Sequence, residues 1–283
     1  MKKDSFLFKL GNFKCIAVSD GTFTYTDQSF YQNAPKEHLK KIFSEHDLQS
    51  GEITTPYTCL FVDTGKHRIL VDTGMGAGVV PSVGKLLMNL RDEGIEGTDI
   101  DTVILTHGHA DHIGGIINAE GKLAFPNARY VMWKEEWDFW ISEPNLAQLK
   151  MDEPIKQLLR MSARKNLPPI KNQLNLIDHE TEILPGINVI SAPGHTPGHI
   201  ALRISSGGEH LLCAADTVLS PIHLEKPDWR PVFDFDHEQA AAAKHKIFDK
   251  AASEKSLVYV FHFPFPSLGY VVKKGEGWQW QPI

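Results

Sequence analysis

The amino-acid sequence predicts an α+β fold made of two β-sheets, each covered by helices on its outer face. Short apolar runs bounded by turn residues, as expected for strands, occur in both halves of the chain. Segments with apolar side chains at helical spacing interrupt these runs in each half. Strands, then a helix, then a histidine-bearing segment occur in that order twice. Because a sheet must be covered to bury its apolar face, the repeated order favours two sheets beneath outer helices.

Length and composition favour a single folded unit. The chain has 283 residues, 42% of them hydrophobic, which is enough to bury a substantial core. No low-complexity stretch or linker divides the sequence. We therefore expect residues 1–283 to form one domain.

The individual elements follow from turn residues and periodicity. Gly11-Asn12 separates two strands as a hairpin turn, residues 19–21 predict a further turn, and Asp236 is expected to cap a long helix. The expected strands are residues 6–10, 13–18, 58–62, 68–71, 100–105, 129–133, 173–177, 187–191, 200–204, 211–214 and 257–261. The expected helices begin at Pro35, cover residues 82–93, follow residue 133, lie within residues 144–166 and begin after Asp236.

Charge and cysteine usage exclude several classes of function. The net charge is −6 and the basic residues are dispersed, so a nucleic-acid partner is not expected. The three cysteines are widely spaced in apolar runs, which predicts reduced core thiols. No run is long enough to cross a membrane, and no signal peptide is visible. These features lead us to expect a cytoplasmic protein with no membrane partner.

The segment from Thr106 to His112 carries four potential metal ligands within six residues. His107 and His109 are two residues apart in an extended stretch and point to the same side, whereas Asp111 and His112 turn away as a helix begins. One segment can therefore serve two metal ions. Three histidines and one carboxylate do not complete two coordination shells, so further ligands are required.

Three later residues supply the missing ligands, because each follows the end of an expected strand. These residues are His195, Asp216 and His262. Loops beyond strand ends commonly carry functional side chains. We expect one ion on His107, His109 and His195, the other on Asp111, His112 and His262, and the carboxylate of Asp216 between them. Imidazole and carboxylate ligands suit zinc best, with iron, manganese or cobalt as other occupants.

These motifs resemble those of the metallo-β-lactamase superfamily. The HxHxDH segment, the later Pro193-Gly194-His195-Thr196-Pro197-Gly198-His199 segment and Asp216 carry the resemblance, which extends over most of the chain. It implies a four-layer αββα sandwich with a dinuclear metal site at one edge. The segment from His262 to Gly269 looks like the methyl parathion hydrolase-like branch, which includes quorum-quenching lactonases.

Two positions depart from the lactonase pattern. Many acyl-homoserine lactonases of this superfamily have a tyrosine three residues after the bridging aspartate, where this chain has Leu219. They also tend to have a Gly-His-Asp final ligand segment, whereas His262 lies in an aromatic and proline-rich loop. The second departure favours the organophosphate-hydrolase-like relatives.

The expected chemistry is hydrolysis of a lactone, ester or phosphotriester in a small-molecule substrate. Two cations that share one solvent oxygen lower its pKa to roughly 7 and supply a bridging hydroxide as nucleophile. Asp111 and Asp216 are the expected catalytic carboxylates, and Asp111 is also a candidate proton donor to the leaving group. Asp72, at the end of an expected strand, is expected to orient a ligand imidazole.

Residues near the ligands are candidates for the substrate pocket. We expect Trp140, Leu219 and Phe263 to line it, because ligand pockets are mainly apolar. His199 is expected to be structural, and an ordinary loop role is expected for His223. The apolar pair Phe30-Tyr31 could support a homodimer.

Two alternative functions compete with the hydrolase. A persulfide dioxygenase-like oxidoreductase shares the HxHxDH cluster but uses a single iron, and the full ligand set with His112 and His262 argues against it. In a non-catalytic metal-binding protein the ions would only stabilise the fold. A bridging aspartate beside an apolar loop favours catalysis.

Overall fold

The computed structural model describes residues 4–283, and its strands form two mixed seven-stranded sheets. The first sheet has the spatial order β1 (Ser5–Leu10), β2 (Phe13–Thr26), β3 (Glu52–Asp63), β4 (Arg68–Val71), β5 (Thr102–Ile104), β6 (Arg129–Trp133) and β7 (Leu174–Ile177). The second has the order β14 (Gly277–Pro282), β13 (Leu268–Lys274), β12 (Leu257–Tyr259), β11 (Glu209–Cys213), β10 (Ile200–Ser206), β9 (Ile187–Ser191) and β8 (Glu182–Leu184).

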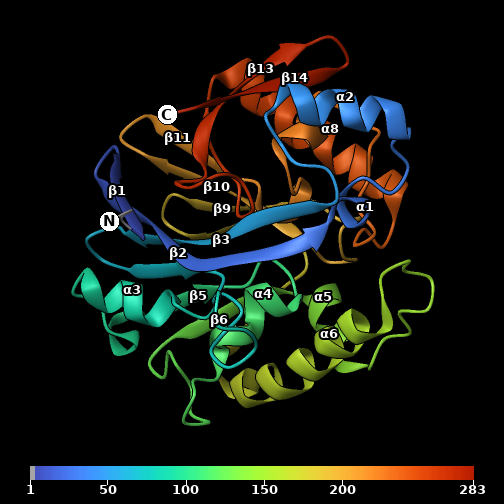
Figure 1. Ribbon diagram of the computed structural model, residues 1–283. Helices are drawn as coiled ribbons and strands as arrows, with labels where there is room; N and C mark the ends of the chain where they lie inside the picture. Colours follow the sequence, from blue (N-terminus) through green and yellow to red (C-terminus); the bar gives the residue numbers. More distant parts are fainter. Residues whose placement is uncertain (1–3) are drawn as a thin grey trace.

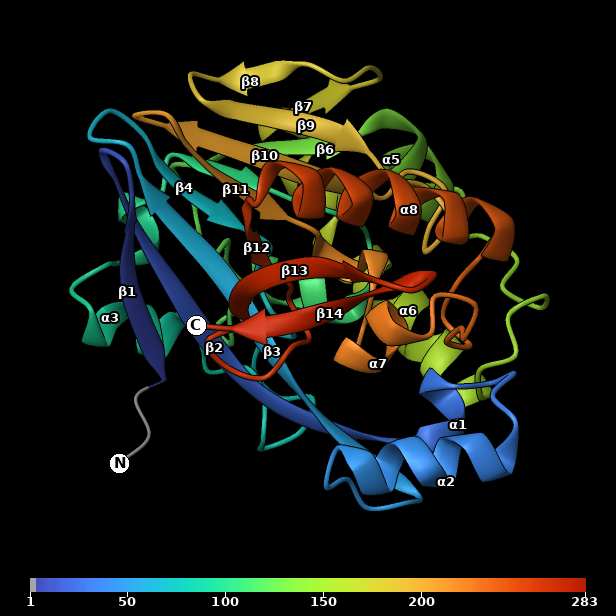
Figure 2. The same ribbon diagram turned by 90° about the horizontal axis from the view of Figure 1, so that it is seen from above.

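Helices cover the outer faces of both sheets, which gives the expected four-layer αββα sandwich (Figures 1 and 2). Beneath the first sheet in Figure 1 lie α3 (Leu86–Asp92), α4 (Ala110–Ile113), α5 (Lys134–Ile141) and α6 (Glu153–Asn166). The second sheet is covered by α8 (His237–Glu254), with α7 (Pro221–Glu225) packed against β14. The short α1 (Asp27–Phe30) and α2 (Lys36–Glu45) follow the far end of β2 (Figure 2).

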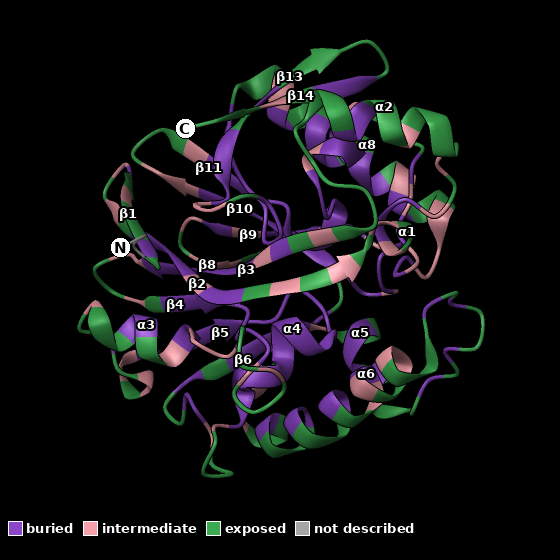
Figure 3. Cartoon of the chain, in the orientation of Figure 1, coloured by how far each residue is buried: buried purple, intermediate pink, exposed green. Residues whose placement is uncertain are grey.

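The core has three parts that match these layers. Between the sheets, side chains such as Leu60 and Val71 pack against Leu202 and Cys213. Two further clusters lie between each sheet and its helices, and Figure 3 shows the buried strands in the centre of the molecule. All three cysteines are free and buried, as the sequence predicts. Of the described residues, no helix is both long and apolar enough to cross a membrane.

The turn expected at residues 19–21 is wrong, because β2 continues through it to Thr26. A β-bulge between Ser19 and Gly21 accommodates the change of register with β3. The bulge turns the buried Asp20 towards the loop before α3, where its carboxylate accepts hydrogen bonds from the backbone N–H groups of Met75, Gly84 and Leu86. Asp20, a residue type common in turns, therefore holds the loop before α3 in place.

Other differences lie at element ends and in the last part of the chain. Helix α3 begins at Leu86 instead of residue 82. The hairpin of β13 and β14 was not expected, because one of its faces is exposed and polar and lacks a strong apolar alternation. Phe30 and Tyr31 are 1% and 2% exposed, so the segment proposed for a dimer contact is buried within the chain.

Candidate metal centre

Seven side chains from four loops meet at one edge of the sandwich. The segment His107–His112 follows β5 of the first sheet, His195 follows β9, Asp216 follows β11 and His262 follows β12 of the second. All seven are at most 8% exposed. Loops after strands on both sheets thus converge where the sheet edges meet, which places the predicted ligands together.

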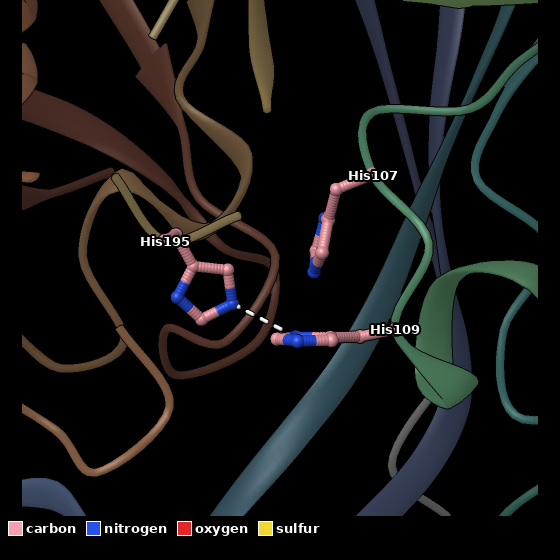
Figure 4. Close-up of side chains that lie close together, drawn as sticks. All are labelled: His107, His109 and His195. Atoms are coloured by element: carbon pink, nitrogen blue, oxygen red, sulfur yellow. Dashed lines mark hydrogen bonds between the residues drawn. The ribbon is translucent and has the colours of Figure 1, made fainter. Parts of the chain in front are cut away.

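The first group comprises His107, His109 and His195, whose candidate ligand atoms lie within 4.8 Å of one another. In Figure 4 the three rings converge from two sides, His107 and His109 from the loop that leads into α4 and His195 from the opposite loop. Nε2 of His195 lies 3.0 Å from Nδ1 of His109. An ion bound here would take nitrogen ligands from both sheets.

The second group comprises Asp111, His112 and His262, which also lie within 4.8 Å. Nε2 of His262 is 3.4 Å from Oδ2 of Asp111. The carboxylate of Asp216 lies between the two groups. Its Oδ2 is 3.1 Å from Nε2 of His262 and 3.4 Å from Nε2 of His195, and its Oδ1 is 3.3 Å from Nε2 of His112.

The residues fit divalent metal ions. Among the described residues, three buried atoms that face the centre have no hydrogen-bond partner: Nε2 of His107, Nε2 of His112 and Oδ1 of Asp216. Buried polar atoms are normally paired, so atoms left unpaired and directed at one point are explained by a ligand there. Imidazole nitrogens and carboxylate oxygens form a donor set suited to zinc and related ions.

The side chains are strongly coupled by charge. Burial lowers the pKa of His107 and His109 well below the ordinary value, and the neighbouring imidazoles lower it further. Burial acts the same way on His112, but nearby carboxylates, that of Asp216 foremost, raise its pKa well above the ordinary value. Burial raises the pKa of Asp216, but His262 and His112 together hold it well below its usual range. A cation would therefore meet an ionised bridging carboxylate.

Asp72, which the sequence predicts to orient a ligand imidazole, contacts the candidate ligand His112. Its Oδ2 lies 2.8 Å from Nδ1 of His112. The same carboxylate accepts hydrogen bonds of 2.8 Å from the backbone N–H and the hydroxyl of Thr106. Because Nδ1 of His112 is directed at Asp72, its Nε2 faces the metal centre.

Asp234 plays the same part for His195, and the sequence did not single it out. Its Oδ1 lies 2.9 Å from Nδ1 of His195. Backbone hydrogen bonds from Phe235 to His195 and from Asp236 to Gly194 hold the two loops together. The only signal in the sequence was its position two residues before the predicted helix cap, Asp236. Nothing in the local sequence connects Asp234 to His195.

Glu136 joins the two loops that carry the first ligand group. This buried carboxylate of α5 accepts hydrogen bonds of 2.8 Å from the backbone N–H groups of Gly108 and Gly198, and one of 2.7 Å from the indole of Trp140. A Cβ on Gly108 would lie 2.2 Å from the Trp140 ring, and one on Gly198 would lie 2.4 Å from the backbone nitrogen of Glu136. Glycine at both positions allows this close approach.

Trp140 and Phe263 occupy positions different from the predicted ones. The ring of Trp140 packs edge-on against His109, at 5.6 Å between ring centroids, and its indole donates a hydrogen bond to Glu136. Phe263 is 0% exposed and packs against Trp280 in the core beneath α8. Neither side chain is among those lining the cavity at the metal centre. Both were chosen for nearness in sequence, which does not fix the side a residue faces.

The other two histidines discussed above are structural. Nε2 of His199 accepts a hydrogen bond from the backbone N–H of Asp216, while its Nδ1 lies 3.0 Å from the carbonyl of Ala192. His223 is buried in the helix α7, so the expected loop role is wrong, and its Nε2 bonds to the carbonyl of Phe30. Burial lowers the pKa of both to about 3. His199 thus fixes the loop that presents Asp216.

An apolar cavity opens onto the metal centre. Leu219, a candidate pocket residue, lines it together with side chains from β2, α6 and the loop before α8. Its polar atoms come mainly from candidate ligands. The lining residues are Phe23, Tyr25, Phe30, Met75, His109, Ala110, Asp111, Ile155, Leu158, Leu159, His195, Asp216, Leu219, Phe233 and His262.

Comparison with known proteins gives a consistent result. The model of the family described as "Metallo-beta-lactamase superfamily" matches residues 54–262. An N-acyl homoserine lactonase, AiiA, from Bacillus thuringiensis subsp. kurstaki is 25% identical over 230 residues, which cover 74% of this chain and 82% of the relative.

Solved structures extend the similarity to the whole chain. The structure of AidC, described as a dizinc quorum-quenching lactonase in complex with a product, N-hexnoyl-L-homoserine, has a TM-score of 0.90 at 32% identity and covers 100% of this chain and 99% of its own. AbOPH, described as a hydrolase in the beta lactamase superfamily, has a TM-score of 0.88 at 25% identity, with 100% and 98% covered.

Proposed function

This chain belongs to the metallo-beta-lactamase superfamily and is a metal-dependent hydrolase, and we propose that it opens lactone rings that carry an apolar acyl chain. One observation carries the proposal. The cavity at the metal centre is lined on its outer sides by hydrocarbon and aromatic groups, while its polar atoms gather at the candidate ligands. An apolar chain suits the walls, and a polar ring suits the centre.

We assign two divalent ions to this centre. His107, His109 and His195 would hold one, Asp111, His112 and His262 the other, and the carboxylate of Asp216 would bridge them. Zinc is the proposed metal, which the donor set favours and for which the dizinc relative AidC is a precedent. When bound, the ions supply Lewis acidity and lower the pKa of a shared water, so that hydroxide is available at neutral pH.

The chain's own residues then orient the reaction. Asp72 and Asp234 fix the rings of His112 and His195. Asp216 contacts ligands of both groups, and Asp111 lies beside the cavity as well as in the second group. We propose that Asp111 passes a proton to the alkoxide that leaves when the ring opens. Asp111 would thereby serve both metal binding and proton transfer, while Asp216 would serve metal binding.

The small volume of the cavity implies that side chains in its walls must move to admit a substrate. Its volume is about 60 Å³, well below the roughly 300 Å³ or more of pockets that enclose drug-sized ligands. Substrate entry therefore requires displacement of lining side chains. Ile155 and Leu158 lie on α6 and are half-buried, unlike the buried Leu159 beside them. Leu158→Ala should improve kcat/KM for longer acyl chains relative to shorter ones.

A hydrolysis panel with the metal-loaded protein tests the proposal. Acyl-homoserine lactones of increasing chain length, aryl esters and phosphotriesters would be compared, with metal content measured on the same samples. Turnover of lactones above that of the other two classes is expected, as is loss of activity and of bound metal in His109→Ala. Preference for phosphotriesters, or no lactone turnover in fully metallated protein, would overturn the lactone assignment.

The two alternatives raised by the sequence are less well supported. The relatives are named as lactonases and metallo-hydrolases, not as oxidoreductases. A purely structural metal site would be closed by protein ligands. Here the candidate ligands His109, Asp111, Asp216 and His262 also line a cavity, which favours a reacting site.

A further inference from the structure

The cavity wall contains one hydroxyl-bearing aromatic side chain that the proposed function has not used. Tyr25 lies on β2, far in sequence from every candidate ligand, and lines the cavity together with Asp111, Asp216 and His262. We propose that the Tyr25 hydroxyl donates a hydrogen bond to the substrate carbonyl oxygen and stabilises the negative charge that develops there during attack. This role rests on the proposed lactone hydrolysis.

The β-ribbon of β2 and β3 directs Tyr25 towards the site. Beyond the bulge at Asp20, residues Gly21 to Thr26 pair with Glu52 to Tyr57 in regular antiparallel register. Along this stretch Thr22, Thr24 and Thr26 are exposed, whereas Phe23 and Tyr25 are partly buried. Alternate residues of a strand face opposite sides, so Phe23 and Tyr25 both face the cavity.

Aromatic neighbours hold the Tyr25 ring in place. Phe23, Phe30 and Phe233 lie at 4.8, 5.4 and 5.5 Å from it between ring centroids. These come from β2, α1 and the loop before α8. A ring packed from several directions has little rotational freedom, so its hydroxyl is fixed before substrate arrives. A donor fixed in advance needs no reorganisation during the reaction.

A second tyrosine determines the direction of the Tyr25 proton. The hydroxyl of Tyr57 is hydrogen-bonded to that of Tyr25, and its ring packs against His262 at 5.2 Å. Tyr57 is 0% exposed, and in the described residues its hydroxyl has no other partner among the hydrogen bonds of the structure. Tyr57 therefore donates to the Tyr25 oxygen, because its own proton has no other acceptor. The Tyr25 proton remains free for the cavity.

The proposed chemistry requires a hydrogen-bond donor at the carbonyl oxygen, and Tyr25 itself transfers no proton. A hydroxide oxygen forms a bond to the lactone carbonyl carbon, and the carbonyl π electron pair moves onto the carbonyl oxygen. The neutral phenol, whose ordinary pKa is about 10, donates to that oxygen and keeps its proton. The pair then returns as the ring C–O bond breaks. Asp111 takes up the proton of the attacking hydroxide as the new C–O bond forms and passes it to the leaving alkoxide.

Tyr25→Phe tests the proposal because it keeps the ring and removes only the hydroxyl. Loss of one preorganised donor lowers kcat by about 10²-fold, with unchanged metal content and melting temperature. The inhibition constant of a non-hydrolysable lactam analogue should change far less than kcat, because the charge develops only in the transition state. Tyr57→Phe should lower kcat by a smaller factor, since it loosens the direction of the Tyr25 hydroxyl.

Tyr130→Phe is the matched control, because it also removes a buried hydroxyl, one bonded to the Phe125 carbonyl in the helix-side core. Its kcat should equal that of the wild type. Wild-type kcat in metallated Tyr25→Phe, or equal losses in kcat and lactam binding, would refute the role of Tyr25. Absence of lactone turnover in the wild type would instead refute the proposed function. If Tyr25→Phe does not fold, Tyr57→Phe replaces it as the test. An unchanged kcat in folded Tyr57→Phe would then refute the catalytic role of the hydrogen-bonded Tyr57 and Tyr25 hydroxyls.

Discussion

At the scale of single residues, two carboxylates orient candidate ligand histidines of the metal centre. Asp72 and Asp234 lie 2.8 and 2.9 Å from Nδ1 of His112 and His195. Each carboxylate selects the tautomer in which Nε2 is free for a metal and makes the ring a better ligand. Both contacts are buried, so they are little weakened by solvent.

Asp234→Ala should weaken metal binding by about 10 to 100-fold, because His195 loses the partner that orients it. Asp234→Asn should weaken it less, since the amide oxygen can still accept from Nδ1. Metal affinity would be measured by competition with a chromogenic chelator. Asp228→Ala is the control, because that carboxylate is exposed in the same loop. Wild-type affinity in Asp234→Ala would show that His195 is held by its other contacts.

At this scale the sequence predicted the candidate ligands, but not all of the residues that contact them. His107, His109, Asp111 and His112 are recognisable because they lie within six residues of one another. Asp234 is 39 residues from His195, and nothing local links the two. Asp72 could be predicted because it ends an apolar run, as functional residues after strands commonly do. Trp140 and Phe263 failed as pocket residues because nearness in sequence does not determine orientation.

At the scale of elements, α5 acts as a clamp on the two ligand-bearing loops. Its Glu136 accepts backbone hydrogen bonds from Gly108 in one loop and Gly198 in the other. Burial raises the pKa of this carboxyl above its ordinary value, and its hydrogen bonds oppose the shift. The helix therefore fixes the position of the loop that carries His107 and His109 relative to the loop that carries His195.

Glu136→Gln should lower the free energy of unfolding by about 1 to 3 kcal/mol, because an amide N–H₂ would face backbone N–H donors and leave buried groups unpaired. Chemical denaturation of the protein with metal ions bound would measure the loss. Glu135→Gln provides a matched control, since its neighbour on α5 is exposed, and it should stay within about 0.5 kcal/mol of the wild type. Equal stability of the two variants would contradict the role of Glu136 in holding the two loops together.

Strand and helix positions were predictable where periodicity was strong. β6 (Arg129–Trp133) and β9 (Ile187–Ser191) have the expected bounds, and Asp236 caps α8 by accepting from the N–H groups of Glu238 and Gln239. β2 was predicted too short, because Asp20-Gly21 has the composition of a turn but forms a bulge within a paired strand.

At the scale of the whole molecule, the metal centre connects the two halves of the sandwich. Its candidate ligands follow β5 in the first sheet and β9, β11 and β12 in the second. Bound ions would thus bridge segments that otherwise meet only through packing and hydrogen bonds. Without ions, buried atoms of His107, His112 and Asp216 have no hydrogen-bond partner among the described residues, which is unfavourable.

Removal of the ions should therefore destabilise the fold. A site held at about 1,000 times its dissociation constant contributes about 4 kcal/mol through preferential binding to the native state. Calorimetry before and after exhaustive chelation should show a lower melting temperature that returns when zinc is restored. Chelation should not change the melting temperature of metal-free His109→Ala. If chelation leaves the melting temperature of the wild type unchanged, the ions do not link the two sheets.

The sequence by itself determined the two-sheet architecture and the candidate ligands, because strand periodicity and closely spaced histidines are local signals. Only the tertiary structure decided which side chains support those candidate ligands and which line the cavity beside them. Asp234, Glu136 and Tyr25 reach the centre from separate loops, helices and strands, and their positions depend on how the layers pack. Tyr25 in particular lies on a strand that the sequence predicted to end at residue 18. Its orientation depends on a bulge and on aromatic neighbours from three segments.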